Sequence, residues 1–248
     1  MDLGITGKVA LVTGASRGLG LAAGRALADE GCRVAICGRD EARIADAATA
    51  IGARPIVADM SVRGDPARVV TEVAATLGPI DILVANAGGP TPGGFMDVSD
   101  DDWEQAVQQN LMGTVRLMRA VVPSMRERQW GRIITITSRT VREAIDGLVL
   151  SNATRAGVAG AVRTLAREVA RDGVTVNNVL PGSFATERLV ELHGSAEAVA
   201  QRGQASSMGR IGEPDELGAV IAFLASRQAS YLTGASILVD GGESHVIA

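Results

Sequence analysis

Seven short apolar runs, spaced along the whole chain, limit its possible folds more than any other feature of the sequence. They are continuous and rich in β-branched side chains, as in strands that are buried on both faces of a parallel sheet. The runs cover residues 9–12, 34–37, 55–58, 82–85, 133–137, 174–180 and 237–240. Ala-, Arg- and Glu-rich segments of helical length separate them, so right-handed crossovers would give a doubly wound sheet. We therefore predict one three-layer α/β domain over residues 1–248, with about seven strands and helices on both faces.

Composition argues against several classes of function. A net charge of −4 and an aromatic content of 2% provide neither a basic surface nor stacking platforms for nucleic acid. No apolar run approaches the roughly 18 residues that a membrane-spanning helix needs. The N-terminal segment has Asp2 and lacks a basic region typical of signal peptides, so we expect a cytoplasmic protein. Cys32 and Cys37 lack partners for zinc, and we expect reduced, buried thiols and no metal site.

A glycine-rich segment, TGASRGLG, follows the first apolar run at residues 13–20 and leads into a predicted helix. Its glycines allow a sharp turn and a close approach of the backbone to a diphosphate. The N-terminus of the helix then offers unpaired N–H groups and the positive end of its dipole to that anion. In this strand–loop–helix context the motif predicts a dinucleotide site. The residues expected to form it are Gly14, Ser16, Arg17, Gly18, Leu19 and Gly20.

The end of the second apolar run bears on the choice between NADP(H) and NAD(H). An acidic residue there accepts hydrogen bonds from a ribose 2′-hydroxyl, whereas an arginine suits a 2′-phosphate. Arg39 occupies this place, and Arg17 could reach the same phosphate, so a two-arginine clamp is expected. NADP(H) is therefore favoured. NAD(H) would be used instead if Asp40 served as the ribose acceptor.

Further motifs follow in a fixed order: ADM at 58–60, NAG at 86–88, PGSFAT at 181–186, and a tail from GRIGEP at 209–214 to VDGG at 239–242. Together with TGASRGLG, Asn110 and Ser138, they resemble the short-chain dehydrogenase/reductase family, especially its 3-oxoacyl-acyl-carrier-protein reductases. The resemblance covers essentially the whole chain. It implies a Rossmann-like fold, a homotetramer, and hydride transfer between NADP(H) and a carbonyl or alcohol substrate, with a 3-oxoacyl thioester as one candidate.

The resemblance also implies roles for individual residues. Ser138 would hydrogen-bond the substrate carbonyl oxygen, and Asn110 would interrupt a helix to hold a water. A segment near 187–208 would cover the substrate. The remaining residues implied to contact the cofactor are Asp59 and Met60 beside the adenine, Asn86, Ala87 and Gly88 along the nucleotide, and Pro181, Gly182 and Thr186 beside the nicotinamide.

The chain departs from the family at its catalytic tyrosine and lysine. Ser151 stands thirteen residues after Ser138, where the tyrosine belongs, and Arg155 stands where the lysine belongs. A serine hydroxyl is a weaker acid than a phenol and is shorter. Arg155 keeps a positive charge for ribose hydroxyls but releases no proton near neutral pH. Losing a general acid typically costs about 10²–10⁴ in rate, so hydride transfer would be weakened but not abolished.

Three other residues are candidates to compensate for the missing acid. Arg142 would stabilise an oxyanion and leave water as the proton source. His193 has a suitable ordinary pKa, and Tyr231, the chain's one tyrosine, would have to enter from a neighbouring subunit.

Two other functions stay open, because fold alone cannot choose among them. One is a non-redox lyase, aldolase or isomerase, and the other is a nucleotide-binding protein with little or no catalysis.

Overall fold

The computed structural model describes residues 2–204 and 206–246, apart from the side chains of residues 193, 196, 200 and 202. Within these residues, seven parallel strands form one sheet in the order β3-β2-β1-β4-β5-β6-β7. The predicted fold class is thus confirmed, and every predicted strand boundary lies within two residues of an observed one. The strands are β1 (Val9–Val12), β2 (Arg33–Gly38), β3 (Arg54–Val57), β4 (Ile82–Asn86), β5 (Gly131–Ile136), β6 (Val174–Pro181) and β7 (Ser236–Val239).

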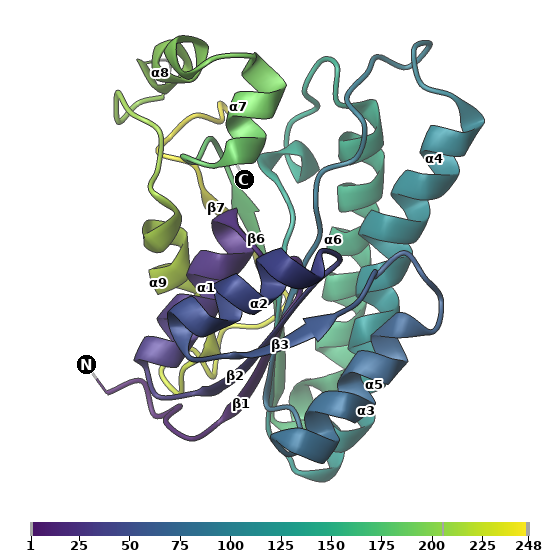
Figure 1. Cartoon of the computed structure of the whole chain (residues 1–248), viewed down its shortest axis with the longest axis vertical. Coiled ribbons are helices and arrows are strands. Elements are labelled where there is room, and N and C mark those ends of the chain that lie inside the picture. The colour runs from purple at the N-terminus through teal and green to yellow at the C-terminus, as the bar shows by residue number, and fades with distance from the viewer. Residues whose placement is uncertain (1, 205, 247–248) are drawn as a thin grey trace.

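Helices cover both faces of the sheet (Figure 1). Three of them, α1 (Gly18–Asp29), α2 (Glu41–Ile51) and α9 (Pro214–Ala225), bury their apolar sides against one face. The opposite face is covered by α3 (Asp65–Thr76), α5 (Gly113–Glu127) and α6 (Val149–Val169). The remaining elements are α4 (Asp100–Ala106), the π-helical turn η1 (Val107–Met112), the short 3₁₀ turns η2 (Arg139–Val141) and η3 (Ala170–Asp172), α7 (Glu187–His193) and α8 (Ala196–Gln204).

The central strands are apolar throughout because each of their faces meets a helical layer. In β1, Val9 and Leu11 pack into the cluster with α3, α5 and α6, whereas Ala10 and Val12 pack into the cluster with α1, α2 and α9. All four side chains are at most 1% exposed. This two-sided burial is the physical reason for the continuous apolar runs in the sequence.

The start of α3 differs in detail from the usual capping pattern. Pro66 lies in the first turn, but the residue before the helix is Gly64, and Asp65 is already helical. The Asp65 carboxylate instead accepts hydrogen bonds from the backbone N–H of Asp59, at 2.8 Å, and from Arg68 Nε, at 3.1 Å. Asp65 therefore holds the turn after β3, where Asp59 lies.

The order of the strands creates a crevice at one end of the sheet. The chain proceeds outward from β1 through β2 to β3 and then returns to the other side of β1 to form β4. At such a reversal, the loops after the two neighbouring strands leave in opposite directions, and ligands bind between them. In Figure 1, α7 and α8 lie beyond this end of the sheet. In the described part of the chain, no helix is long and apolar enough to cross a bilayer.

Candidate active site

A cavity of about 380 Å³ occupies the crevice at the carboxyl ends of the strands. Its wall combines the glycine loop, the ends of four strands (β2, β4, β5 and β6), the start of α6, and α7. Most of the predicted site residues therefore meet in one space, although their separation in the sequence exceeds 150 residues. Those that line the cavity are Gly14, Ser16, Arg17, Gly18, Leu19, Arg39, Asp59, Met60, Asn86, Ala87, Gly88, Ser138, Ser151, Arg155, Pro181, Gly182 and Thr186.

The glycine loop has the geometry of an anion-binding turn. Gly14 and Gly18 adopt positive φ values of 57° and 56°, which side chains disfavour. A Cβ on Gly20 would lie only 2.4 Å from the carbonyl oxygen of Gly14, so this glycine allows the loop to close behind the cavity wall. Helix α1 begins at Gly18, and no side chain caps its first turn. Its N-terminal N–H groups are thus available for a diphosphate.

Asn86 braces this loop from the end of β4. Its backbone N–H donates to Thr13 Oγ1 at 3.0 Å, and Thr13 Oγ1 donates to the Asn86 carbonyl oxygen at 2.8 Å. The Asn86 side-chain Nδ2 donates to the carbonyl oxygen of Gly14 at 2.9 Å. The two strands at the reversal point are therefore tied together where the cavity begins.

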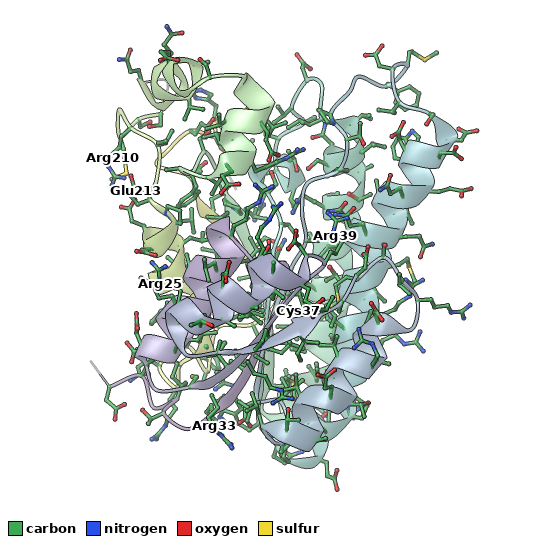
Figure 2. All side chains as sticks on the ribbon, in the orientation of Figure 1. Arg25, Arg33, Cys37, Arg39, Arg210 and Glu213 are labelled. Atoms are coloured by element: carbon green, nitrogen blue, oxygen red, sulfur yellow. The ribbon has the colours of Figure 1, made fainter. Side chains whose placement is uncertain are left out.

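The two arginines expected to share a 2′-phosphate have different surroundings. Arg39 is exposed at the end of β2 and lines the cavity (Figure 2). Arg17 instead forms ion pairs with Glu187 and Glu191 of α7, the latter at 3.0 Å. These contacts hold its guanidinium against α7. Asp40 caps α2 by accepting a hydrogen bond from the backbone of Arg43, at 2.9 Å, and is not part of the cavity wall.

Ser138 and Ser151 lie in one hydrogen-bonded cluster with Thr140. The backbone N–H of Thr140 donates to Ser138 Oγ at 3.1 Å, so the Ser138 hydroxyl proton is left to point elsewhere. The Oγ atoms of Thr140 and Ser151 are 3.4 Å apart. Ser138 is half-buried and Ser151 is buried at the start of α6.

Arg155 lies one helical turn beyond Ser151 and is hydrogen-bonded to this cluster. Its Nε donates to Ser151 Oγ at 3.1 Å, and its Nη1 donates to the carbonyl oxygens of Ile136 and Thr137 at 3.3 and 2.7 Å. Burial, with a smaller effect from the positive charge of Arg188, lowers the pKa of Arg155 to about 10. The guanidinium is therefore cationic at neutral pH.

Asn110 lies behind the wall, in the π-helical turn η1. Its Nδ2 donates to the carbonyl oxygen of Gly88 at 2.7 Å, while its Oδ1 is buried without a hydrogen-bond partner among the described residues. π-helical turns inside longer helices are frequent at functional sites. The unpaired Oδ1 is consistent with the expected role of Asn110 in holding a water, because buried waters satisfy such atoms.

The three candidates to compensate for the missing acid differ in their position relative to the cavity. Arg142 is exposed, lies outside the cavity wall, and directs Nη2 toward the carbonyl oxygen of Ser236 at 3.5 Å. The expectation that it stabilises an oxyanion is therefore wrong for this arrangement. Tyr231 is fully exposed and also absent from the wall of its own chain's cavity. The side chain of His193 lies outside the described part of the structure.

Arg188 is a cavity residue that the sequence patterns did not reveal. It lies in the first turn of α7, and its Nη2 donates to the carbonyl oxygen of Pro90 at 2.9 Å. Its guanidinium also packs over Gly89, where an added Cβ would be 3.1 Å from Arg188 Nε. Its position two residues after the PGSFAT motif is the one signal that could have indicated it.

Known proteins resemble this chain over nearly its whole length. A family model described as enoyl-(acyl carrier protein) reductase matches residues 14–244. The chain is 38% identical over 241 residues to a 3-oxoacyl-acyl-carrier-protein reductase of Salmonella typhimurium, covering 95% of this chain and 97% of that protein. It is 36% identical over 247 residues to an acetoacetyl-CoA reductase of Shinella zoogloeoides, covering 96% and 99%.

Among solved structures, the L-sorbose reductase of Gluconobacter frateurii, complexed with NADPH and L-sorbose, superposes with a TM-score of 0.94. The two sequences are 31% identical, and the match covers 100% of both chains. The sequence motifs, the strand order and these matches agree over the whole length. The chain belongs to the short-chain dehydrogenase/reductase family.

Proposed function

We propose that this protein is an NADP(H)-dependent reductase or dehydrogenase that interconverts a carbonyl compound and its alcohol. One observation carries the proposal: a single cavity joins the uncapped N-terminus of α1 to the Ser138 hydroxyl. A dinucleotide whose diphosphate sits at that N-terminus would extend along the NAG and PGSFAT segments toward Ser138. The positive-φ glycines and the uncapped helix fit such a ligand.

NADP(H) is the preferred cofactor in this proposal. Arg39 projects an exposed guanidinium at the end of β2, where a 2′-phosphate would lie. Asp40, the candidate acceptor for a 2′-hydroxyl, is engaged in capping α2. The related sorbose reductase was solved with NADPH. Arg17 would join Arg39 only after leaving its two glutamate partners.

The nicotinamide, when bound, supplies or accepts the hydride. Ser138 orients the substrate, because its Oγ already accepts the Thr140 N–H and its own proton is left for the carbonyl oxygen. Arg155 places a fixed positive charge next to Ser151. This charge favours the negative charge that develops on the carbonyl oxygen of the substrate. The described wall of the cavity holds no phenol. In this proposal solvent water supplies the proton that the alkoxide takes up, beside the positive charge of Arg155.

The proposal extends to the assembly and location of the protein. We propose one domain with a substrate-covering segment near 187–208, which includes α7 and α8. Residue 205 of that segment is outside the described residues. As in the family resemblance, the subunits would form a homotetramer through α4–α5, α6, α9 and β7. The cytoplasm suits the two buried free cysteines, which would stay reduced there.

A hydride-transfer screen tests the function directly. Oxidation of NADPH and NADH would be followed against a panel of ketones, oxo acids and 3-oxoacyl thioesters, beside a binding titration of each coenzyme. We expect substrate-dependent oxidation of NADPH, and its loss by about 10²-fold or more in Ser138→Ala. Ser230→Ala, at an exposed position, serves as the matched control. Unchanged turnover in Ser138→Ala would refute the assigned site.

The absence of a phenol from the site favours one alternative function. Ser138 and Arg155 together could stabilise an enolate without any hydride transfer, as in a lyase, aldolase or isomerase. Conversion of a carbonyl substrate without any change in nicotinamide absorbance would identify this alternative. Tight NADPH binding without turnover of any substrate in the panel would instead indicate a nucleotide-binding protein.

A further inference from the structure

Arg155 is a buried cation, and within the described part of the chain no carboxylate compensates its charge. Only 8% of the residue is exposed. Its hydrogen bonds go to one hydroxyl and two backbone carbonyl oxygens, all of them neutral. Among the described residues, no carboxylate raises its pKa; the one charge that affects it is the cation of Arg188. Burying an unpaired charge is costly, and buried charges in proteins are generally paired or bound to a metal ion.

A second arginine lines the same cavity. Arg188 is anchored on the loop after β4 by its hydrogen bond to the Pro90 carbonyl oxygen. Its carboxylate partner is Glu191, at 3.5 Å, and Glu191 also pairs with Arg17 at 3.0 Å. Glu187 pairs with Arg17 as well and is exposed. Glu191 is thus shared between Arg17 and Arg188, whereas the more buried Arg155 has no carboxylate partner among the described residues.

The replacement of tyrosine by serine gives a ligand access to this charge. A phenol at position 151 would fill the space between α6 and the substrate, whereas the short Ser151 side chain leaves that space open. Ser151 and Arg155 both line the cavity, beside Ser138, where the reacting carbonyl is placed. A group attached close to that carbonyl can thus approach the guanidinium of Arg155, whose planar N–H groups suit carboxylates.

We propose that the substrate is an oxo acid or hydroxy acid whose carboxylate is held between Arg155 and Arg188 while its carbonyl or hydroxyl oxygen faces Ser138. This inference rests on the proposed oxidoreductase function and names its substrate class. The carboxylate supplies the negative charge that the buried guanidinium lacks. Residues Ser151 and Arg155 then form a binding subsite for an anion in place of the family's proton-donating pair.

Matched pairs of small ligands test this proposal by binding rather than by turnover. The ligands are acetoacetate with its neutral counterpart acetoacetamide, and pyruvate with pyruvamide. Each is titrated calorimetrically into the full-length protein saturated with NADP⁺, which permits no reduction. We expect the carboxylate of at least one pair to bind about 10-fold to 100-fold more tightly than the amide, as charge-assisted hydrogen bonds generally allow.

Variants then locate the effect. Arg155→Gln and Arg188→Gln should each remove most of the preference for the carboxylate, and Arg155→Lys should retain part of it. Arg25→Gln, which removes an exposed arginine paired with Asp215 on the outer face of α1, should leave the preference unchanged. Arg188 lies on the surface-facing helix α7, so its variant remains informative if Arg155→Gln fails to fold.

The outcomes separate this inference from the function on which it rests. Failure of NADP⁺ to saturate the protein would remove the proposed function and the inference with it. Saturation by NADP⁺ together with equal affinities within both pairs, or with no detectable carboxylate binding, would overturn the inference alone. A carboxylate preference that survives both arginine-to-glutamine changes would also overturn it, and would show that these arginines serve only the nucleotide.

Discussion

At the scale of single residues, the proposed chemistry of the site depends on Ser151 and Arg155. A tyrosine and a lysine spaced in this way place a phenol and an ammonium on one face of the helix. Here the same face carries a hydroxyl that accepts a hydrogen bond from Arg155 Nε at 3.1 Å. The guanidinium is therefore fixed by its neighbours, and the pair provides charge rather than a transferable proton.

Restoring the family's tyrosine and lysine should separate proton donation from the binding of an anion. In the double variant Ser151→Tyr/Arg155→Lys, a phenol beside an ammonium supplies the missing general acid. We expect kcat for a neutral ketone to rise by about 10²-fold or more, within the range typical of general acids. The affinity for a carboxylate ligand should fall in the same variant, because the phenol occupies the anion subsite. Steady-state kinetics and calorimetry on one preparation measure both changes. A rise in kcat together with a rise in carboxylate affinity would contradict the proposed anion subsite.

The pH dependence of carboxylate binding follows from the depressed pKa of Arg155. Burial lowers this pKa from 12.5 to about 10, so the guanidinium is charged at neutral pH and loses its proton as the pH rises through about 10. Carboxylate affinity should be constant from neutral pH to about pH 9 and decline above that, while amide affinity stays level. Between the folded and unfolded pKa values the unfolded chain binds the extra proton, so this group itself stabilises the fold as pH rises. A decline that begins near neutral pH would contradict the assignment.

Sequence patterns predicted which residues meet at the site better than they predicted their contacts. Short residues such as Gly14 and Ser138 follow the backbone, so a motif that places the backbone places them too. Arg17 was expected at the 2′-phosphate, yet its long side chain pairs with glutamates of α7 that lie 170 and 174 residues away. Arg188 was missed for the same reason, because only tertiary packing decides where a flexible cation points.

At the scale of elements, the strands were predictable and their connections less so. Burial on both faces produces the continuous apolar runs, and that pattern depends little on neighbouring detail. The cap of α3 was not predictable, because the Asp65 carboxylate has an alternative partner in the backbone of Asp59. The family resemblance implied an interruption at Asn110, but its form, the π-helical turn over Val107–Met112, emerged only from the structure.

The turn from β1 to α1 provides a steric test at this scale. In Gly20→Ala the added Cβ would meet the Gly14 carbonyl oxygen at 2.4 Å and Asn86 Nδ2 at 2.8 Å, so the loop must open. We expect at least a 10-fold loss of NADPH affinity and a lower Tm, because both contacts are with atoms that hold the loop closed. Gly64→Ala is the matched control, since its Cβ would meet nothing within 4 Å and its φ of −84° is ordinary. Equal NADPH affinities in the two variants would show that the loop does not cradle the cofactor.

At the scale of the whole molecule, the site exists because the order of strand connections reverses between β1 and β4, while all the strands stay parallel. The two helical layers stabilise the sheet, and the loops at its carboxyl end are left to bind ligands. Helix α7 covers this end and contacts both sides of the crevice, through Arg188 to the loop after β4 and through Glu187 and Glu191 to the glycine loop. Substrate and cofactor are therefore expected to meet beneath one covering segment.

Titration of the purified protein with NADPH and with NADH is the most direct measurement of the central claim, that this crevice holds a dinucleotide. We expect saturable binding of NADPH, with an affinity at least about 10-fold higher than that for NADH. In Arg39→Ala the difference between the NADPH and NADH affinities should narrow while NADH affinity remains, because the exposed guanidinium is expected to contact only the 2′-phosphate. If neither coenzyme shows saturable binding, the account is contradicted, and every role assigned to Ser138, Ser151 and Arg155 is contradicted with it.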